Sequence, residues 1–178
     1  MAEGHQIDFA DYFQRVHGSL PYDKYLFDNG ELRRVLMSLP GRRVGFTNAD
    51  AAHTERVLKA LGIEECFHQL LTFETFNPIP ISSGVRCKPN VDVFAEALKL
   101  AHVVDPARVV FLDDSSTNIK VAKALGMHTV FVGSVEKCEG ADEAVHELQG
   151  IVHCAPHLLQ ENVVRFRGGK EIMREYSR

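Results

Sequence analysis

The sequence predicts an α/β fold, a Rossmann-like wound parallel sheet with helices on both faces, from three observations. Short apolar runs alternate with amphipathic helical patterns, polar residues follow directly after the runs, and one run, at 108–112, is unbroken in its apolarity after Arg108. Such alternation is typical of βαβ units with parallel strands. The uninterrupted run is expected to be buried on both faces. The length of 178 residues suits one domain.

The strands are expected at 43–47, 70–73, 108–112 and 128–132, with a short last strand at 144–148. Helices should follow Asp50, Pro89 and Ser115 or Ser116, because a capping residue or proline precedes apolar positions at helical spacing in each place. Gly62 and Gly126 are expected to end two of these helices. A final helix at 149–160 should be interrupted near Pro156.

The first forty residues differ from the rest, because they are aromatic and helical in pattern. Asp28 precedes a clear amphipathic helix. We therefore divide the chain into a partial helical cap with a lead-in helix at 1–40, an α/β core at 41–162 and a mobile tail at 163–178. A basic targeting patch is the alternative for this tail.

Composition excludes several classes of function. The net charge of −4 and the pI near 6.1 argue against a nucleic-acid partner. No apolar stretch approaches the roughly 20 residues of a membrane span, and Met1 to Gln6 lack the apolar core of a signal peptide. We expect no membrane partner and a cytoplasmic location, with the nucleus as the alternative. The sequence leaves the oligomeric state open.

The four cysteines are widely spaced and are expected to be free thiols in a reducing compartment. A late cluster of histidines and cysteines has no Cys-x-x-Cys pair and fits no zinc template. We interpret its members as ordinary surface and core residues: Cys138, His146, His153, Cys154 and His157.

Residues that can carry chemistry fall at three expected strand ends: Thr47-Asn48, Lys88 just before Pro89 opens a helix, and Asp113-Asp114. In open parallel sheets, ligands bind beyond the carboxyl ends of the strands. The adjacent carboxylates should repel by about 3 kcal/mol, which a divalent cation such as Mg²⁺ would offset. Because side chains alternate across a strand, we expect one of the two aspartates to ligate the cation directly and the other to lie behind it. The alternative is that one aspartate only caps the next helix.

Lys88 precedes a helix start, where a cation is disfavoured. It is well explained if an anion lies between the ammonium and the helix; the alternative is a lysine that extends into water. Thr47 could bind a phosphate oxygen, although a β-branched residue also suits a strand.

With these residues in this order, the chain resembles the haloacid dehalogenase-like phosphatase superfamily over roughly residues 7–160. Phe46-Thr47-Asn48 is similar to its second motif, Lys88-Pro89 to its third, and the stretch from Phe111 to Ile119 to its fourth. Within the superfamily the chain looks most like the plant-type pyrimidine 5′-nucleotidase-like branch. The segments that carry this resemblance are Val16 to Tyr22, Phe46 to Asp50, Cys87 to Pro89 and Gly140 to Asp142.

The resemblance implies Mg²⁺-dependent hydrolysis of a small phosphorylated metabolite, such as a nucleoside 5′-monophosphate. Thr47 and Asn48 would bind phosphate, and Lys88 would neutralise the phosphorylated centre. Asp114 would ligate the metal, with Asp113 behind it as a further catalytic residue. Asn118 would orient Lys88.

The resemblance also implies a first motif, Asp-x-Asp, that supplies a nucleophile and a proton donor; the 178 residues contain no Asp-x-Asp. The nearest imitation, Tyr25 to Gly30, has one carboxylate and is better interpreted as a turn and helix cap. The family's central strand, expected between the strands at Val44 and Val109, would then be missing.

Two hypotheses follow. The chain is a phosphohydrolase impaired by loss of its nucleophile, or a non-catalytic remnant that binds phosphate or a partner: a pseudoenzyme, a splice product or a partial gene model. Receiver domains are excluded because their acidic pair comes first, and dinucleotide binding because no Gly-x-Gly-x-x-Gly follows a strand.

Overall fold

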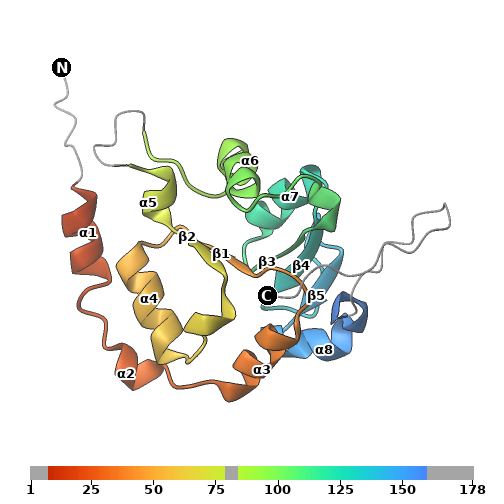
Figure 1. Ribbon diagram of the computed structural model, residues 1–178, viewed down its shortest axis with the longest axis horizontal. Coiled ribbons are helices and arrows are strands. Elements are labelled where there is room, and N and C mark those ends of the chain that lie inside the picture. Colours follow the sequence, from red (N-terminus) through yellow and green to blue (C-terminus); the bar gives the residue numbers. More distant parts are fainter. Residues whose placement is uncertain (1–7, 79–83, 160–178) are drawn as a thin grey trace.

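The computed structural model describes residues 8–78 and 84–159, and it confirms an α/β fold of parallel strands and helices (Figure 1). The predicted tail at 163–178 lies outside the described residues. The helices are α1 Phe9–Val16, α2 Tyr22–Tyr25, α3 Gly30–Ser38, α4 Ala51–Ala60, α5 Phe73–Phe76, α6 Val91–Leu100, α7 Ser116–Ala124 and α8 Ile151–Cys154. The strands are β1 Val44–Phe46, β2 Gln69–Leu71, β3 Val110–Asp113, β4 His128–Val132 and β5 Glu143–Val145. No helix among these residues is long and apolar enough to cross a membrane.

The strands form two parallel sheets in the described part of the chain. β1 pairs with β2, placing Gly45 opposite Leu70, and the second sheet has the order β3-β4-β5. Figure 1 shows the two sheets side by side, with α4 beside the first and α7 beside the second. β1 and β3 are not paired with each other, so the two sheets share no ladder of backbone hydrogen bonds.

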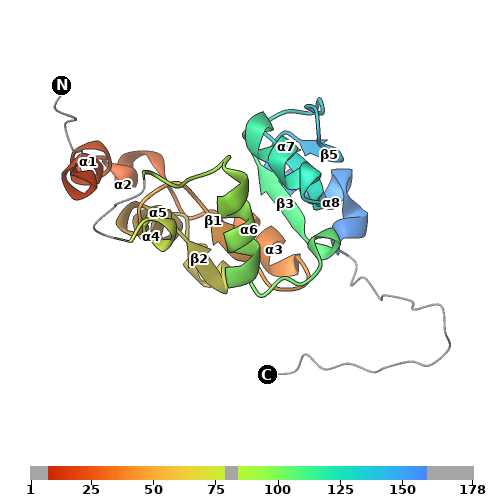
Figure 2. The same ribbon diagram turned by 90° about the horizontal axis from the view of Figure 1, so that it is seen from above.

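Two helices hold the sheets together by burying side chains against both. α6 turns Val93 and Ala97 toward a cluster with Leu71, and Phe94 toward a second cluster with Ala122 of α7. Figure 2 shows α6 between β1–β2 and β3. α3 acts similarly, because Leu36 packs in one cluster with Leu58, while Val35 packs with Ile151 of α8.

The expectation that the run at 108–112 is buried on both faces is wrong. Val110 is 38% exposed, and the other residues of β3 are only partly buried. The physical reason is the position of the strand: among the described residues β3 pairs with β4 alone and is the edge of its sheet. With a neighbouring strand on one side only, the apolar side chains of β3 are less buried than the pattern predicted.

Several predicted boundaries shift because a polar side chain caps a helix. The strand expected at 70–73 ends at Leu71, because Thr72 and Thr75 form a capping box that starts α5. α6 starts after Asn90, whose side chain accepts from the Asp92 amide, and not at Pro89. The strand expected at 144–148 is β5, which begins one residue earlier and ends at Val145.

Other caps are confirmed. The Asp50 carboxylate accepts the His53 amide at the start of α4, and Gly62, at φ +67°, follows its end. β4 spans 128–132 as predicted. The segment after Glu147 is broken into the 3₁₀ turns Leu148–Gly150 and Pro156–Leu159 with α8 between them, so Pro156 does interrupt it.

The segment from Tyr25 to Gly30 is a turn and a cap, as predicted. Asn29, not Asp28, caps α3 by accepting the Leu32 amide. Asp28 instead packs against Gly62, where an added Cβ would come within 2.3 Å of Asp28 Oδ2. Asp28 thus lies at the α3–α4 corner and not at the end of a strand.

The corner before β5 is organised by one carboxylate. Asp142 Oδ2 accepts hydrogen bonds from the amide and hydroxyl of Thr129, and Oδ1 from the Lys123 ammonium. Burial acts to raise the pKa of Asp142, but these hydrogen bonds outweigh it and lower the pKa to about 2.

We predict that Asp142 stabilises the fold above pH 4 and that this contribution is lost as the pH falls from about 4 toward 2. The sign follows because the pKa is depressed in the folded state, so the unfolded chain binds the proton first. Urea unfolding at pH 5 and pH 3.5 checks this. Asp142→Asn should lower the unfolding midpoint at pH 5 and reduce its fall between the two values.

The matched control is Glu147→Gln, an exposed carboxylate outside this corner. It should leave both midpoints nearly unchanged. An Asp142→Asn protein with the same pH dependence as the unmodified chain would contradict the prediction.

Candidate functional site

The side chain of Lys88 joins the carboxyl ends of β1 and β3. Its Nζ donates to the Phe46 carbonyl at 2.8 Å and to Asp113 Oδ2 at 2.7 Å. The Lys88 and Asp113 side chains are 10% and 6% exposed, so this ion pair is largely removed from water. The sequence predicted that these elements meet, and the structure brings them to one point. Within the protein, the ammonium has the Phe46 carbonyl and the Asp113 carboxylate as partners, and its binding of an anion stays a prediction.

The carboxylate of Asp113 is held on both oxygens. While Oδ2 accepts from Lys88, Oδ1 accepts the Ser115 amide at 2.8 Å and the Asn118 side chain at 2.9 Å. Asn118 is buried, as part of α7. It therefore orients Asp113 directly and Lys88 only through that carboxylate, which refines its predicted role.

Asn48 holds the backbone of Lys88. Its amide group donates to the Lys88 carbonyl at 3.0 Å, and its oxygen accepts the Lys88 amide at 2.8 Å. This reciprocal pair fixes the loop that carries Lys88 beside the end of β1. The geometry therefore shows that Asn48 positions Lys88, while its binding of phosphate stays a prediction.

The side chains of Thr47 and Asp114 keep unused hydrogen-bonding capacity. Thr47 Oγ1 accepts the Ala49 amide at 3.1 Å, which leaves its hydroxyl proton for another acceptor. Asp114 is exposed. Within the described residues its carboxylate is in none of the hydrogen bonds or ion pairs.

Sequence analysis missed a polar cluster beside the end of β1. His17 bonds to Asp50, the Tyr22 hydroxyl bonds to His53, and the two histidine rings stack at 4.1 Å. Burial and the neighbouring His17 lower the pKa of His53. For Asp50, burial raises the pKa, but hydrogen bonds from the His53 amide and the His17 ring outweigh it. The cluster ties α1 and α2 to α4.

A pocket lies beside Thr47, but it does not include the Lys88–Asp113 pair. A pocket of about 220 Å³ adjoins Thr47, lined by Phe46, His53 and Phe67 among others, but not by Lys88 or Asp113. Its lining is mostly apolar. An anion held by Lys88 would therefore lie at the strand ends, outside this pocket.

Comparison with known proteins gives this arrangement a context. The model of the haloacid dehalogenase-like hydrolase family matches residues 3–126. "Phosphate metabolism protein 8" of Saccharomyces cerevisiae is 30% identical over 127 residues, which cover 67% of this chain and 39% of the yeast protein. The chain therefore spans about two fifths of the length of this relative.

Solved structures show the same fold. A haloacid dehalogenase-superfamily hydrolase from Geobacter sulfurreducens matches with a TM-score of 0.55 and 18% identity, over 83% of this chain and 73% of that one. L-2-haloacid dehalogenase from Xanthobacter autotrophicus matches with a TM-score of 0.55 and 16% identity, over 71% of this chain and 58% of that one.

We predict that Lys88 and Asp113 stabilise the fold as a coupled pair. Lys88→Met or Asp113→Asn should each lower the free energy of unfolding by roughly 3 kcal/mol, because each leaves a buried partner unpaired. The double variant should lose clearly less than the sum of the two. Urea unfolding of the four proteins measures these values.

Lys99→Met is the control, since Lys99 is an exposed lysine of α6. It should change the free energy of unfolding by no more than about 0.5 kcal/mol. Strictly additive losses at Lys88 and Asp113 would show that the pair is not coupled.

Proposed function

Because the chain belongs to the haloacid dehalogenase-like hydrolase family, we propose that the Lys88 site binds small phosphate monoesters. One observation carries the proposal: an ammonium with two of its three N–H donors used lies where two parallel strands end. The third donor and the Thr47 hydroxyl are the groups available for a phosphate oxygen. Asn48 and Asn118 hold Lys88 and Asp113 in position for this contact.

The charges at this place favour a divalent cation as a companion of the phosphate. Lys88 contributes one positive charge, while Asp113 and Asp114 contribute two negative charges, so these side chains alone would repel a phosphate dianion. Mg²⁺ is usually held by one or two carboxylates together with substrate phosphate, and Asp114 offers an exposed carboxylate. Asp114 would ligate Mg²⁺, which would neutralise phosphate charge, with Asp113 behind it. With one such carboxylate, the affinity for the metal alone should be weak.

We propose nucleoside 5′-monophosphates as the substrate class, following the resemblance to the plant-type pyrimidine 5′-nucleotidase-like branch. The name of the yeast relative, which refers to phosphate metabolism, supports a phosphorylated substrate. A cytoplasmic location belongs to the same proposal.

Hydrolysis by this chain should be strongly impaired. The 178 residues contain no Asp-x-Asp, and Asp113, the best-placed carboxylate, has both oxygens engaged in hydrogen bonds. Loss of a nucleophile costs on the order of 10⁴–10⁶ in turnover. This favours the second candidate function, in which the chain binds phosphate or a phosphorylated partner without turnover.

The proposal predicts that inorganic phosphate binds at least tenfold more tightly with Mg²⁺ than with a chelator, measured by isothermal titration calorimetry. Asp114→Asn should abolish this difference, because it removes the exposed carboxylate. Thr47→Val should weaken binding in both conditions. Asp23→Asn, an exposed carboxylate of α2, is the control and should behave as the unmodified chain.

An assay of nucleoside monophosphate hydrolysis tests the proposal that this chain binds phosphate without turnover. Release of phosphate in the presence of Mg²⁺ should be no faster for the unmodified chain than for Asp114→Asn. Absence of phosphate binding would overturn the proposed site. Turnover well above that of the Asp114→Asn chain would instead establish an active hydrolase and overturn the impairment.

A further inference from the structure

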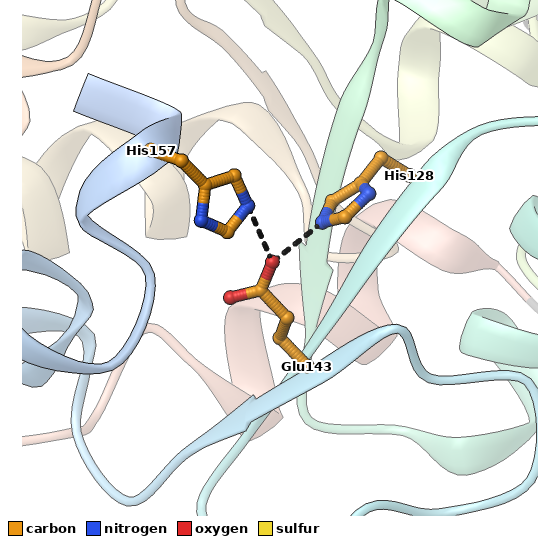
Figure 3. A group of neighbouring side chains, drawn as sticks. All are labelled: His128, Glu143 and His157. Carbon is orange, nitrogen blue, oxygen red and sulfur yellow. Dashed lines mark hydrogen bonds and ion pairs between the residues drawn. The ribbon is translucent and has the colours of Figure 1, made fainter. Parts of the chain in front are cut away.

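Three side chains with metal-ligating atoms meet at the end of the second sheet opposite to Lys88. His128 begins β4, Glu143 begins β5, and His157 lies in the 3₁₀ turn Pro156–Leu159 (Figure 3). The register pairs Val110 with His128 and Asp113 with Phe131, so His128 lies three residues, about 10 Å, along the strands from the level of Asp113. The cluster is therefore separate from the phosphate site.

The pairing of β4 with β5 explains how two of these residues meet. Glu143 is in register with Val130, which shares a face of β4 with His128 because side chains alternate along a strand. His128 and Glu143 are thus diagonal neighbours on one face, within reach for long side chains. The chain then returns past α8 and brings His157 to the same place.

The three ligand atoms lie near enough to one another to surround one ion. Glu143 Oε1 lies 2.9 Å from His128 Nε2 and 2.8 Å from His157 Nε2, and one ligand atom from each residue falls within 4.8 Å of the others. Ligands at zinc distances of 2.0–2.2 Å are about 3.3 Å apart in a tetrahedron. Outward movements of about half an ångström would therefore make room for the ion.

Burial of Glu143 is an independent observation that points to a ligand. Its side chain is only 14% exposed, and its Oε2 is buried with no hydrogen-bond partner among the described residues. A buried carboxylate oxygen without a donor is costly. Both histidines are directed at Oε1, so neither satisfies Oε2 (Figure 3). A cation bound at the carboxylate would compensate this charge.

A second carboxylate is placed behind His128. Asp142 Oδ2 lies 3.7 Å from His128 Nδ1 and is itself fixed by Thr129. In metal sites a carboxylate in this position accepts the Nδ1 proton of the ligating histidine, which leaves Nε2 to the metal. The 3.7 Å separation here is longer than a hydrogen bond, so a small movement of the ring would be needed for that contact.

We propose that His128, Glu143 and His157 form a binding site for Zn²⁺, with water as the fourth ligand. Two imidazoles and one carboxylate suit Zn²⁺ better than Mg²⁺, which prefers oxygen ligands alone. Since the site links β4, β5 and the turn after α8, the bound ion clamps that turn to the sheet. A metal that binds only the folded chain stabilises it.

The test uses the full chain without a histidine tag, first freed of metal with a chelator. Calorimetric titration with ZnCl₂ should give one Zn²⁺ per chain, and Zn²⁺ should raise the unfolding temperature. His157→Gln and Glu143→Gln should each weaken Zn²⁺ binding at least tenfold and remove the rise in unfolding temperature.

His153→Gln is the matched control, because His153 is an exposed histidine of the same segment outside the cluster. It should bind Zn²⁺ as the unmodified chain does. Co²⁺ gives a second readout that does not depend on stability: the unmodified chain should show the visible absorption of a tetrahedral ion, and His157→Gln should not.

No Zn²⁺ binding by the unmodified chain would overturn the proposal. Equal binding by His157→Gln and His153→Gln would also overturn it, since the ion would then be held elsewhere. Phosphate binding at Lys88 should be unaffected by His157→Gln, so the two sites fail or succeed separately.

Discussion

At their carboxyl ends, the two sheets are joined by the two hydrogen bonds of the Lys88 ammonium, and the arrangement of the site depends on them. β1 and β3 exchange no backbone hydrogen bonds, yet Lys88 Nζ donates to the carbonyl of Phe46 and to the carboxylate of Asp113. Phe94 of α6 adds apolar contact, with ring centroids 5.3 Å from both Phe46 and Phe111. The ammonium lies 4.9 Å from the ring centroid of Phe46 and 5.8 Å from that of Phe111, so this one charge connects the two sheets where they share no backbone hydrogen bonds.

The carboxylates at the two ends of the second sheet differ in how their negative charge is compensated. At the carboxyl end of β3, Asp113 is compensated by Lys88 and by two N–H donors. At the amino ends of β4 and β5, Asp142 has the Lys123 ammonium and two Thr129 donors, whereas Glu143 has histidines on one oxygen only. The three carboxylates, Asp113, Asp142 and Glu143, therefore carry different chemistry. What differs is how many donors surround each carboxylate, and this decides which of them still needs a cation.

Sequence reasoning predicted the elements of the site because local rules fix them. Parallel strands place their carboxyl ends together, so Phe46, Lys88 and Asp113 could be expected to meet. Caps such as Asp50 were also readable, because a polar residue before helical spacing has a local cause. The burial of β3 was not predictable, since an apolar run does not reveal which neighbours it lacks. Nor were the partners of Asn48 and Asn118, which depend on loop and side-chain orientation. The cluster of His128, Glu143 and His157 joins residues up to 29 positions apart. Two of them meet because β4 and β5 pair in a particular register, which a motif defined by sequence spacing cannot express.

The engagement of Lys88 limits what the phosphate site can do. Each hydrogen bond that Lys88 makes to Phe46 and Asp113 stabilises the join between the sheets, and each also reduces the charge available to a ligand. A phosphate oxygen that takes the third N–H binds without breaking the join. One that competes with Asp113 would leave a carboxylate that is 6% exposed without its counter-ion, at a cost that phosphate binding would have to exceed. Under the proposed function, an anion that arrives with its own cation would therefore bind more easily than a bare one. This is why the proposal assigns the cation to the exposed Asp114, which takes no part in the contact between the sheets.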